Sequence, residues 1–555
     1  MGKSKQSGTN FLVQGSILAI ASIISRIIGL IYRIPMTAII GDVGNNYYGC
    51  AFDIYNIILI ISSCSLPQAV SKTVSAQVAK GRFRSACQVF KGAMLFAVIS
   101  GLIAALIVFF GAEFFTATLL KTPKSVYALK VLAPVLFVVA VLGVFRGFFQ
   151  GLGTMMPSAV SQIIEQIANA IVSVWAAYVL FGMGKRVGAV LGDSEHYAAA
   201  YGAAGGTLGT ASGALAGLLF VIFVFVVYLK VLRRRMKRER KADVDPFFYT
   251  FKILIITIIP VLLSTTIYNI SGIIDQGIFK NVALLQGHTE HEIDVWWGVF
   301  SGKYKLLINI PIAIASAMAA SSVPTLTASF VESDMERVRS QIHAATRFVM
   351  VIAFPCTVGL TVLAKPIFLL LFPSTAGTAD MAASIMLCGS LAVVFYSLST
   401  LSNGLLQGID QLKVPVVNAV VALVAHIILL VVLMMFFRMN IYAVVLANMF
   451  FALLMCVLNA RAIRKYSGYK QEIKKTFFIP ALCSLIMGVV TWLVYKGFYA
   501  LCKSNTVSAL AAIVAAVLVY FVTLLLLRGM DEEDLSGFPK GQLIIKIAKK
   551  MHLLK

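Results

Sequence analysis

Long apolar runs separated by short polar loops extend along nearly the whole chain. A helix needs about 20 apolar residues to cross the hydrocarbon core of a bilayer, and about fourteen segments of this chain meet that requirement. The predicted spans are centred in 12–39, 48–78, 89–112, 129–149, 157–181, 203–230, 251–279, 296–328, 344–372, 381–406, 414–437, 441–461, 477–499 and 507–527. The pattern therefore predicts an all-α polytopic membrane protein.

Composition supports this fold class and narrows the function. Hydrophobic residues make up 59% of the 555 residues, charged residues make up 13%, and the mean hydropathy is +0.90. A soluble protein does not carry so much apolar surface. The formal net charge of +24 resides mainly in short loops, where it is typical of membrane topology and contact with anionic lipid headgroups. Nucleic acid is therefore not an expected partner.

The basic loops also predict an orientation. With the N-terminus inside, the most basic loops, including the run Lys230–Lys241, all fall on the cytoplasmic side. An even number of spans with both termini in the cytoplasm follows, in a cell membrane. The eight cysteines include no CxxC pair. We expect them to be small buried hydrophobic residues that form no disulfide framework.

Two short motifs recur in the two halves of the chain. Tyr47-Tyr48-Gly49 is echoed by Trp296-Trp297-Gly298, and Gly147-Phe148-Phe149-Gln150-Gly151 is echoed by Gly404-Leu405-Leu406-Gln407-Gly408. The offsets, 249 and 257 residues, are similar. Six predicted spans separate the copies, so we expect two parallel homologous lobes with a site between them.

The repeat and the charge pattern predict five regions. They are an N-terminal lobe over 1–232, a basic cytoplasmic linker over 233–250, a C-terminal lobe over 251–465, two further spans over 466–530 and a cytoplasmic amphipathic tail over 531–555.

The first span carries two arginines on one helical face. Arg26 and Arg33 are seven residues apart, which is two helical turns, and Ser22 and Gly29 fall on the same stripe. An arginine at membrane depth costs at least about 2.5–3.5 kcal/mol and usually faces a bundle interior or a wet cavity. We therefore expect both arginines to face a polar cavity, with a bend at Pro35. The alternative for Arg33 is that it lies near a helix end and snorkels to the membrane surface.

Other spans also carry polar residues at helical spacing. The candidate cavity residues in them are Asp53, Glu165, Asn169, Asp275, Lys303 and Lys305. The alternative for each carboxylate is a structural ion pair, because buried charges usually need partners. Arg146 lies near a predicted inner helix end, where snorkelling is the expected behaviour.

No motif argues for covalent chemistry. The segment HTEHE, from His288 to Glu292, contains metal-ligand residue types, but no third ligand is identifiable and a solvated loop is the better interpretation. Nucleotide-binding loops and catalytic nucleophile motifs are not found. We predict no enzyme activity, no catalytic residue, no metal and no cofactor.

With these residues in view, the chain resembles the multidrug/oligosaccharidyl-lipid/polysaccharide (MOP) exporter superfamily. Within it, the chain is most similar to the polysaccharide-biosynthesis branch, which contains the stage V sporulation protein B and YtgP/MurJ-type lipid II flippase groups of Gram-positive bacteria. The residues that carry the resemblance are SRIIGLIYRIP at 25–35, IGDVGN at 40–45, Pro67, Ser71 and Lys72, Pro311, Val323, Pro324 and Leu326, and Lys365-Pro366-Ile367.

The resemblance implies a fold and a site. The fold would be two six-helix lobes in a V, with two additional C-terminal helices, working by alternating access. In the related flippases, cationic residues of the first and eighth helices are thought to engage a diphosphate. Arg26 matches the first-helix arginine and Lys305 is the best match on the eighth helix. The second first-helix arginine of those flippases falls at Tyr32, one place before Arg33, and one residue rotates a helical side chain by about 100°.

We therefore expect a flippase for an undecaprenyl-pyrophosphate-linked cell-wall precursor, with lipid II as the favoured substrate and the protein acting as a monomer. Arg26, Arg33, Lys303 and Lys305 would bind the diphosphate, and Asp53 would pair with these cations when the site is empty. Glu165, Asn169 and Asp275 would line the cavity or take part in coupling to a monovalent cation or to the membrane potential. The alternatives are a flippase for another polyprenyl-linked glycan, of capsular or teichoic type, and a cation-coupled drug exporter. The forked guanidinium of arginine matches the oxygens of a phosphate. Because most of the candidate residues are basic, a cavity lined by them suits a diphosphate better than a cationic drug.

Overall fold

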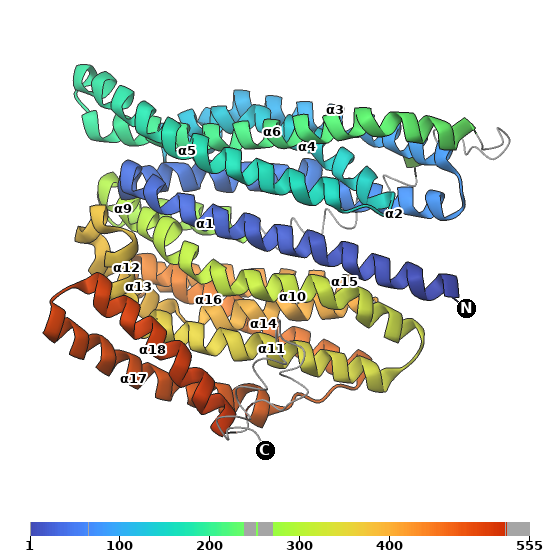
Figure 1. Ribbon diagram of the computed structural model, residues 1–555. Coiled ribbons are helices and arrows are strands. Elements are labelled where there is room, and N and C mark those ends of the chain that lie inside the picture. The colour runs from blue at the N-terminus through green and yellow to red at the C-terminus, as the bar shows by residue number, and fades with distance from the viewer. Residues whose placement is uncertain (1, 65, 238–250, 253–269, 528, 530–555) are drawn as a thin grey trace. The chain divides into compact units, whose positions relative to one another are not determined.

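The computed structural model describes residues 2–64, 66–237, 251–252, 270–527 and 529 (Figure 1). Every regular element in these ranges is a helix. Ten described helices are long and apolar enough to cross a membrane, or eleven if the bent pair Pro373–Gly389 and Ala392–Gly408 is one span. The predicted all-α membrane fold is confirmed, and a total of fourteen spans stays a prediction because part of the predicted seventh span lies outside the described residues.

The chain forms two compact units, Met1–Gly302 and Lys303–Lys555. The main helices of unit 1 are α1 (Gly2–Leu59), α2 (Leu66–Ala79), α3 (Phe83–Glu113), α4 (Val126–Gly151), α5 (Met156–Leu191), α6 (Ser194–Lys237), α8 (Ser271–Leu285) and α9 (Glu290–Val299). Those of unit 2 are α10 (Lys305–Val331), α11 (Met335–Val362), α12 (Ala364–Leu371), α13 (Ala379–Gly389), α14 (Ala392–Gly408), α15 (Lys413–Met435), α16 (Asn440–Ser467), α17 (Ile479–Cys502) and α18 (Asn505–Leu526).

The units divide later in the chain than the predicted lobes do. Helix α9 packs on α1, so it belongs to unit 1 by its contacts. The greater part of the predicted linker, residues 238–250, and the predicted tail over 531–555 lie outside the described residues. The five-region organisation therefore stays a prediction.

Helix α1 changes direction sharply at Gly41. Gly41 has φ 70° and ψ −174°, a conformation that a side chain strongly disfavours. The Thr37 hydroxyl donates to the Asn45 side-chain oxygen at 3.2 Å across this point. Eight residues of straight helix would separate these groups by about 12 Å. We expected the bend at Pro35, but Pro35 lies within helical backbone and the break is at Gly41.

Helix α9 approaches the bend of α1 very closely. A Cβ atom on Gly298 would lie 1.9 Å from the backbone oxygen of Asp42, and a Cβ on Gly49 would lie 3.1 Å from the Ser301 hydroxyl. Trp297 and Tyr48, neighbours of these glycines in sequence, are both fully buried. The two copies of the aromatic-Gly motif therefore meet at one junction inside unit 1.

The α5–α6 pair and the α17–α18 hairpin make the most extensive helix–helix contacts of units 1 and 2, respectively. Glycines and alanines of α6 allow its backbone to approach α5, as expected for helices in a membrane. In unit 2, α17 and α18 pack on α11, and the Tyr520 hydroxyl donates to the Val351 carbonyl at 2.7 Å. These contacts hold α6 beside α5, and α17 and α18 beside α11.

Candidate functional site

The polar stripe of α1 faces the polar stripe of α5. The Ser22 hydroxyl donates to Gln162 Oε1 at 3.3 Å, and Asn169 Nδ2 donates to the Tyr32 hydroxyl at 3.3 Å. Gly29, between them, lies close enough for a Cβ to be 3.8 Å from Gln166 Oε1. Two spans that sequence analysis predicted to be amphipathic are therefore polar partners of each other.

Arg26 lies on the same stretch of α1 but remains exposed. It makes no hydrogen bond, ion pair or ring contact with any residue in the described part of the chain. Ile27 and Ile31, which follow it on the helix, are 51% and 60% exposed. A cation on a membrane-spanning helix that has no partner among the described residues of its unit is available to an anionic ligand.

Arg33 has a different environment. Its guanidinium lies over the ring of Tyr48, 4.7 Å from the ring centroid, and its side chain is half-buried. A cation over an aromatic face gains about 0.5–2 kcal/mol, depending on how well water is excluded. The neighbouring Tyr32 is buried and bonded to Asn169. Tyr32, at the position where the related flippases have their second arginine, therefore faces α5. Arg33, one residue later, lies against the part of α1 that follows Gly41.

Glu165 forms an ion pair inside unit 1. Arg146 Nη2 is 2.7 Å from Glu165 Oε2, and Arg146 Nε donates to the Ser161 hydroxyl at 2.8 Å. The expectation that Arg146 snorkels is therefore wrong, because a carboxylate and a hydroxyl of α5 satisfy its guanidinium. Of the two interpretations of Glu165, the structure shows the ion pair.

Asn169 is buried and serves as a junction between helices. Its side-chain oxygen accepts from the Ser173 hydroxyl at 2.8 Å, and Ser173 also donates to the Gly206 carbonyl of α6. Because both ends of the Asn169 amide are bonded, it positions α1, α5 and α6 relative to one another.

The remaining predicted site residues are distributed over both units. Asp53 is half-buried on the second arm of α1, and Asp275 of α8 is 1% exposed. In unit 2, Lys305 is half-buried at the start of α10. The predicted pairing of Asp53 with the arginines stays a prediction.

Lys303 is held within unit 2. It is 1% exposed, and its ammonium donates to the Thr378 hydroxyl at 2.5 Å and to the Thr375 carbonyl at 3.3 Å. Both partners belong to the short 3₁₀ helix η6 (Pro373–Thr378). In this structure Lys303 anchors η6, whereas the sequence placed it among the ligand-binding residues.

Sequence analysis missed a buried ionic cluster in unit 1. Lys280 of α8 is completely buried, and its three ammonium hydrogens match three acceptors. These are Asn46 Oδ1 at 2.8 Å, Thr122 Oγ1 at 2.7 Å and Asp294 Oδ1 at 3.4 Å. Asn46 Nδ2 also donates to Asp294 Oδ1 at 2.8 Å. The only signal in the sequence was a lysine and an aspartate in apolar surroundings, with their partners far along the chain.

A cleft of about 120 Å³ adjoins this cluster. Tyr47, whose hydroxyl lies 2.7 Å from His196 Nδ1, lines it together with Asp294. His288 and Glu292 lie at the start of α9, where Thr289 caps the helix. Within the described ranges, no group of three or more His, Cys, Asp or Glu side chains is arranged to hold a metal ion.

A comparison with known protein families identifies the family of this chain. The family model described as "Polysaccharide biosynthesis protein" matches residues 12–330, which is more than half of the 555 residues. The chain belongs to this family. The match begins within α1, covers unit 1 from residue 12 onward, and extends to the last turn of α10.

Two proteins of Bacillus subtilis (strain 168) are similar to this chain in sequence. The lipid II flippase MurJ is 26% identical over 523 residues, which cover 91% of this chain and 92% of the relative. Stage V sporulation protein B is 23% identical over 541 residues, which cover 97% and 99%. Both relatives therefore align with this chain along nearly their whole length.

Solved structures show the same fold. An inward-closed lipid II flippase MurJ superposes with a TM-score of 0.59 at 16% identity, covering 91% of this chain and 97% of the other. An inward-facing MATE-family multidrug resistance transporter of the MOP superfamily gives 0.61 at 15% identity, covering 81% and 98%. The chain is a multi-pass membrane protein with the all-helical fold of this superfamily, and the V-shaped arrangement of its lobes stays a prediction.

Proposed function

We propose that this protein is a flippase that moves a polyprenyl-pyrophosphate-linked saccharide, with lipid II as the leading candidate, between the leaflets of the cell membrane. The observation that carries the proposal is Arg26, an exposed cation without a partner among the described residues of its unit, on a membrane-spanning helix. A guanidinium presents a planar fork of donors that matches phosphate oxygens.

The family and the names of its relatives support the same reading. The family is described as polysaccharide biosynthesis, and one relative that aligns along most of its length is a lipid II flippase. A transporter of lipid-linked precursors follows at the level of the family. Lipid II as the specific substrate is part of the proposal, as are alternating access and the orientation with both termini in the cytoplasm.

Three further residues have graded roles in the proposed mechanism. Lys305 of α10 is a second candidate cation, and Arg33 would reach a diphosphate by leaving the face of Tyr48. Lys303 would contribute only if it left Thr375 and Thr378. Arg26 is therefore expected to matter most for transport and Lys303 least.

The test is lipid II accessibility at the outer face of cells depleted of their own lipid II flippase and supplied with this gene. We expect restored accessibility with the native protein and loss with Arg26→Ala, while Arg26→Lys retains part because it keeps the charge. Arg186→Ala is the matched control, since Arg186 is an exposed arginine of α5 outside the polar stripe.

Each outcome has a defined meaning when membrane levels of the variants are equal. Full restoration by Arg26→Ala contradicts the role of Arg26. No restoration by the well-expressed native protein contradicts lipid II as the substrate. A flipping assay in vesicles with a capsular or teichoic polyprenyl-linked unit then tests the alternative.

A further inference from the structure

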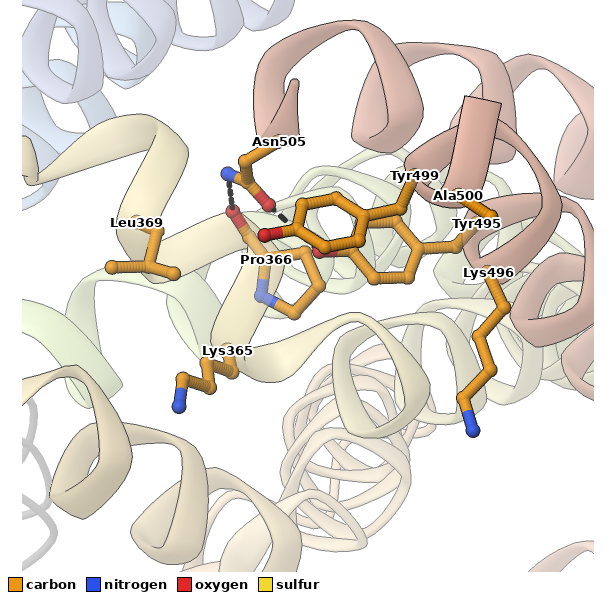
Figure 2. A pocket seen from close by; sticks show the side chains of 8 residues that line it. All are labelled: Lys365, Pro366, Leu369, Tyr495, Lys496, Tyr499, Ala500 and Asn505. Carbon is orange, nitrogen blue, oxygen red and sulfur yellow. Dashed lines mark hydrogen bonds between the residues drawn. The ribbon is translucent and has the colours of Figure 1, made fainter. Parts of the chain in front are cut away.

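Unit 2 contains a pocket of about 470 Å³ between α12 and the α17–α18 hairpin (Figure 2). Its lining residues are Lys365, Pro366, Leu369, Tyr495, Lys496, Tyr499, Ala500 and Asn505. None of them belongs to the polar stripes of α1 and α5, so the pocket is separate from the candidate site described above.

Hydrogen bonds between three elements hold the pocket open. The Tyr495 hydroxyl of α17 donates to Asn505 Oδ1 of α18 at 2.9 Å, and Asn505 Nδ2 donates to the Pro366 carbonyl of α12 at 3.0 Å. The rings of Tyr495 and Tyr499 stack with centroids 5.8 Å apart and an angle of 21° between their planes. The wall is therefore formed before any ligand arrives, which is typical of binding pockets.

The charge of the pocket is positive. Its described lining includes two lysines and no carboxylate. Figure 2 shows Lys365 of α12 and Lys496 of α17 at opposite ends of the pocket, with the stacked tyrosines between them. Two ammonium groups that flank an apolar and aromatic wall suit a phosphate attached to a larger amphipathic molecule.

Neither lysine is committed to a strong partner. Lys365 lies 2.6 Å from Asp380, but the two side chains are 53% and 79% exposed, and ion pairs so exposed contribute little. Lys496 lies 4.0 Å above the ring of Trp492 and is itself exposed. Both ammonium groups retain donors that an incoming phosphate can use.

The surface next to the pocket is suited to lipid. Trp492, Tyr495, Tyr499 and the lysines gather at one end of α17, as residues do at a membrane–water interface. The neighbouring helix surfaces are apolar and exposed, at Leu485, Val489 and Leu493 of α17 and at Val514, Val517 and Leu518 of α18. Acyl chains can lie along these surfaces while a headgroup sits at the level of the lysines.

From these observations we infer that the pocket binds the phosphate-bearing headgroup of an anionic membrane lipid. Lys365 and Lys496, one at each end of the pocket, supply the positive charge that attracts the phosphate, and the stacked tyrosines and Pro366 pack against the rest of the headgroup. The inference stands independently of the transported substrate. A lipid bound here would tie α12 to the hairpin and stabilise unit 2.

The experiment measures lipid retention by the purified full-length protein. Native mass spectrometry counts bound lipids after exposure to equal amounts of phosphatidylglycerol and phosphatidylcholine. We expect selective retention of phosphatidylglycerol, and about a tenfold weaker apparent affinity for it in K365Q/K496Q. The matched control K91Q/K185Q removes two exposed lysines of α3 and α5 and is expected to retain the lipid as the native protein does.

Two further readouts make the result decisive. Phosphatidylglycerol is expected to raise the unfolding temperature of the native protein and of K91Q/K185Q more than that of K365Q/K496Q. Soluble glycerol phosphate is expected not to displace the lipid at equal concentration. Equal retention by both double variants, or no preference for the anionic lipid, would overturn the inference. Binding of glycerol phosphate as tight as that of the lipid would overturn its assignment to a membrane lipid.

Discussion

Arg26 and Lys280 are both cations in apolar surroundings of unit 1, but their environments are opposite. Lys280 is fully buried, and each of its ammonium hydrogens has an acceptor. Arg26 is exposed and has no partner in the described part of the chain. Lys280 therefore serves the stability of the fold, whereas Arg26 is available to bind a ligand. A charged residue within the membrane is therefore not by itself evidence of a binding site. Whether other residues of the protein already neutralise the charge decides if it can bind a ligand.

The largest effect expected from this comparison is on stability at Lys280. Lys280→Met leaves the buried Asp294 carboxylate without its cation, and breaking a buried pair in this way costs about 3–5 kcal/mol. Thermal unfolding of the purified protein in detergent measures the loss. Adding Asp294→Asn removes the unpaired charge and is expected to recover part of it. Native-like stability of Lys280→Met alone would show that the cluster does not hold α8 and α9 to α1.

An intermediate effect is expected at Arg146 and Glu165, whose side chains are 14% and 22% exposed. Replacing either by Gln leaves a partly buried charge, and we expect a coupling energy of about 1–3 kcal/mol in the double-mutant cycle. Chemical unfolding of the two single variants and the double variant gives this value. A coupling near zero would place Glu165 back among the cavity candidates.

A smaller effect is expected at the start of α9. The Thr289 backbone N–H and hydroxyl donate to Glu292, and these hydrogen bonds hold the pKa of the Glu292 carboxyl below its ordinary value. Because the folded pKa is the lower one, the stabilisation is fully present above the unfolded pKa of about 4.3 and is lost as pH falls through the folded pKa. Thr289→Ala is expected to weaken the helix start by about 1 kcal/mol.

Hydrogen exchange of the α9 amides as a function of pH measures this effect. Protection of the first turn is expected to decline on acidification below about pH 4.3 in the native protein. Glu292→Gln is the control, because its amide does not titrate. The same decline in Glu292→Gln would assign the pH dependence to another group.

The smallest stability effect is expected at Arg26. Arg26→Ala removes no described contact, so we expect a change below about 0.5 kcal/mol in unfolding free energy, together with loss of transport. The comparison with Lys280→Met is sharpest here, since one variant loses stability and the other loses function. A large destabilisation by Arg26→Ala would mean that this arginine, too, is structural.

Sequence analysis located the polar stripes but not the faces they meet. The positions of Ser22 and Gly29 in one span and of Glu165 and Asn169 in another predicted polar faces, and the structure shows these two spans bonded to each other. The pairing of Glu165 with Arg146 was open because helix periodicity gives the face of a residue but not the helix opposite. Lys303 was assigned to ligand binding for the same reason, since nothing local to it reveals Thr375 and Thr378.

The sequence by itself determined what depends on local composition and period. These features are the all-α membrane fold, the polar faces of the spans, the motif that carries the family resemblance and the position of Arg26 inside an apolar span. Only the tertiary structure decided which charges are neutralised. Lys280 meets Asn46 across 234 residues and Lys303 meets Thr378 across 75, and partners so distant are brought together only by helix packing. The bend of α1 at Gly41 was decided there as well, together with the close approach of α9 to the neighbouring Asp42.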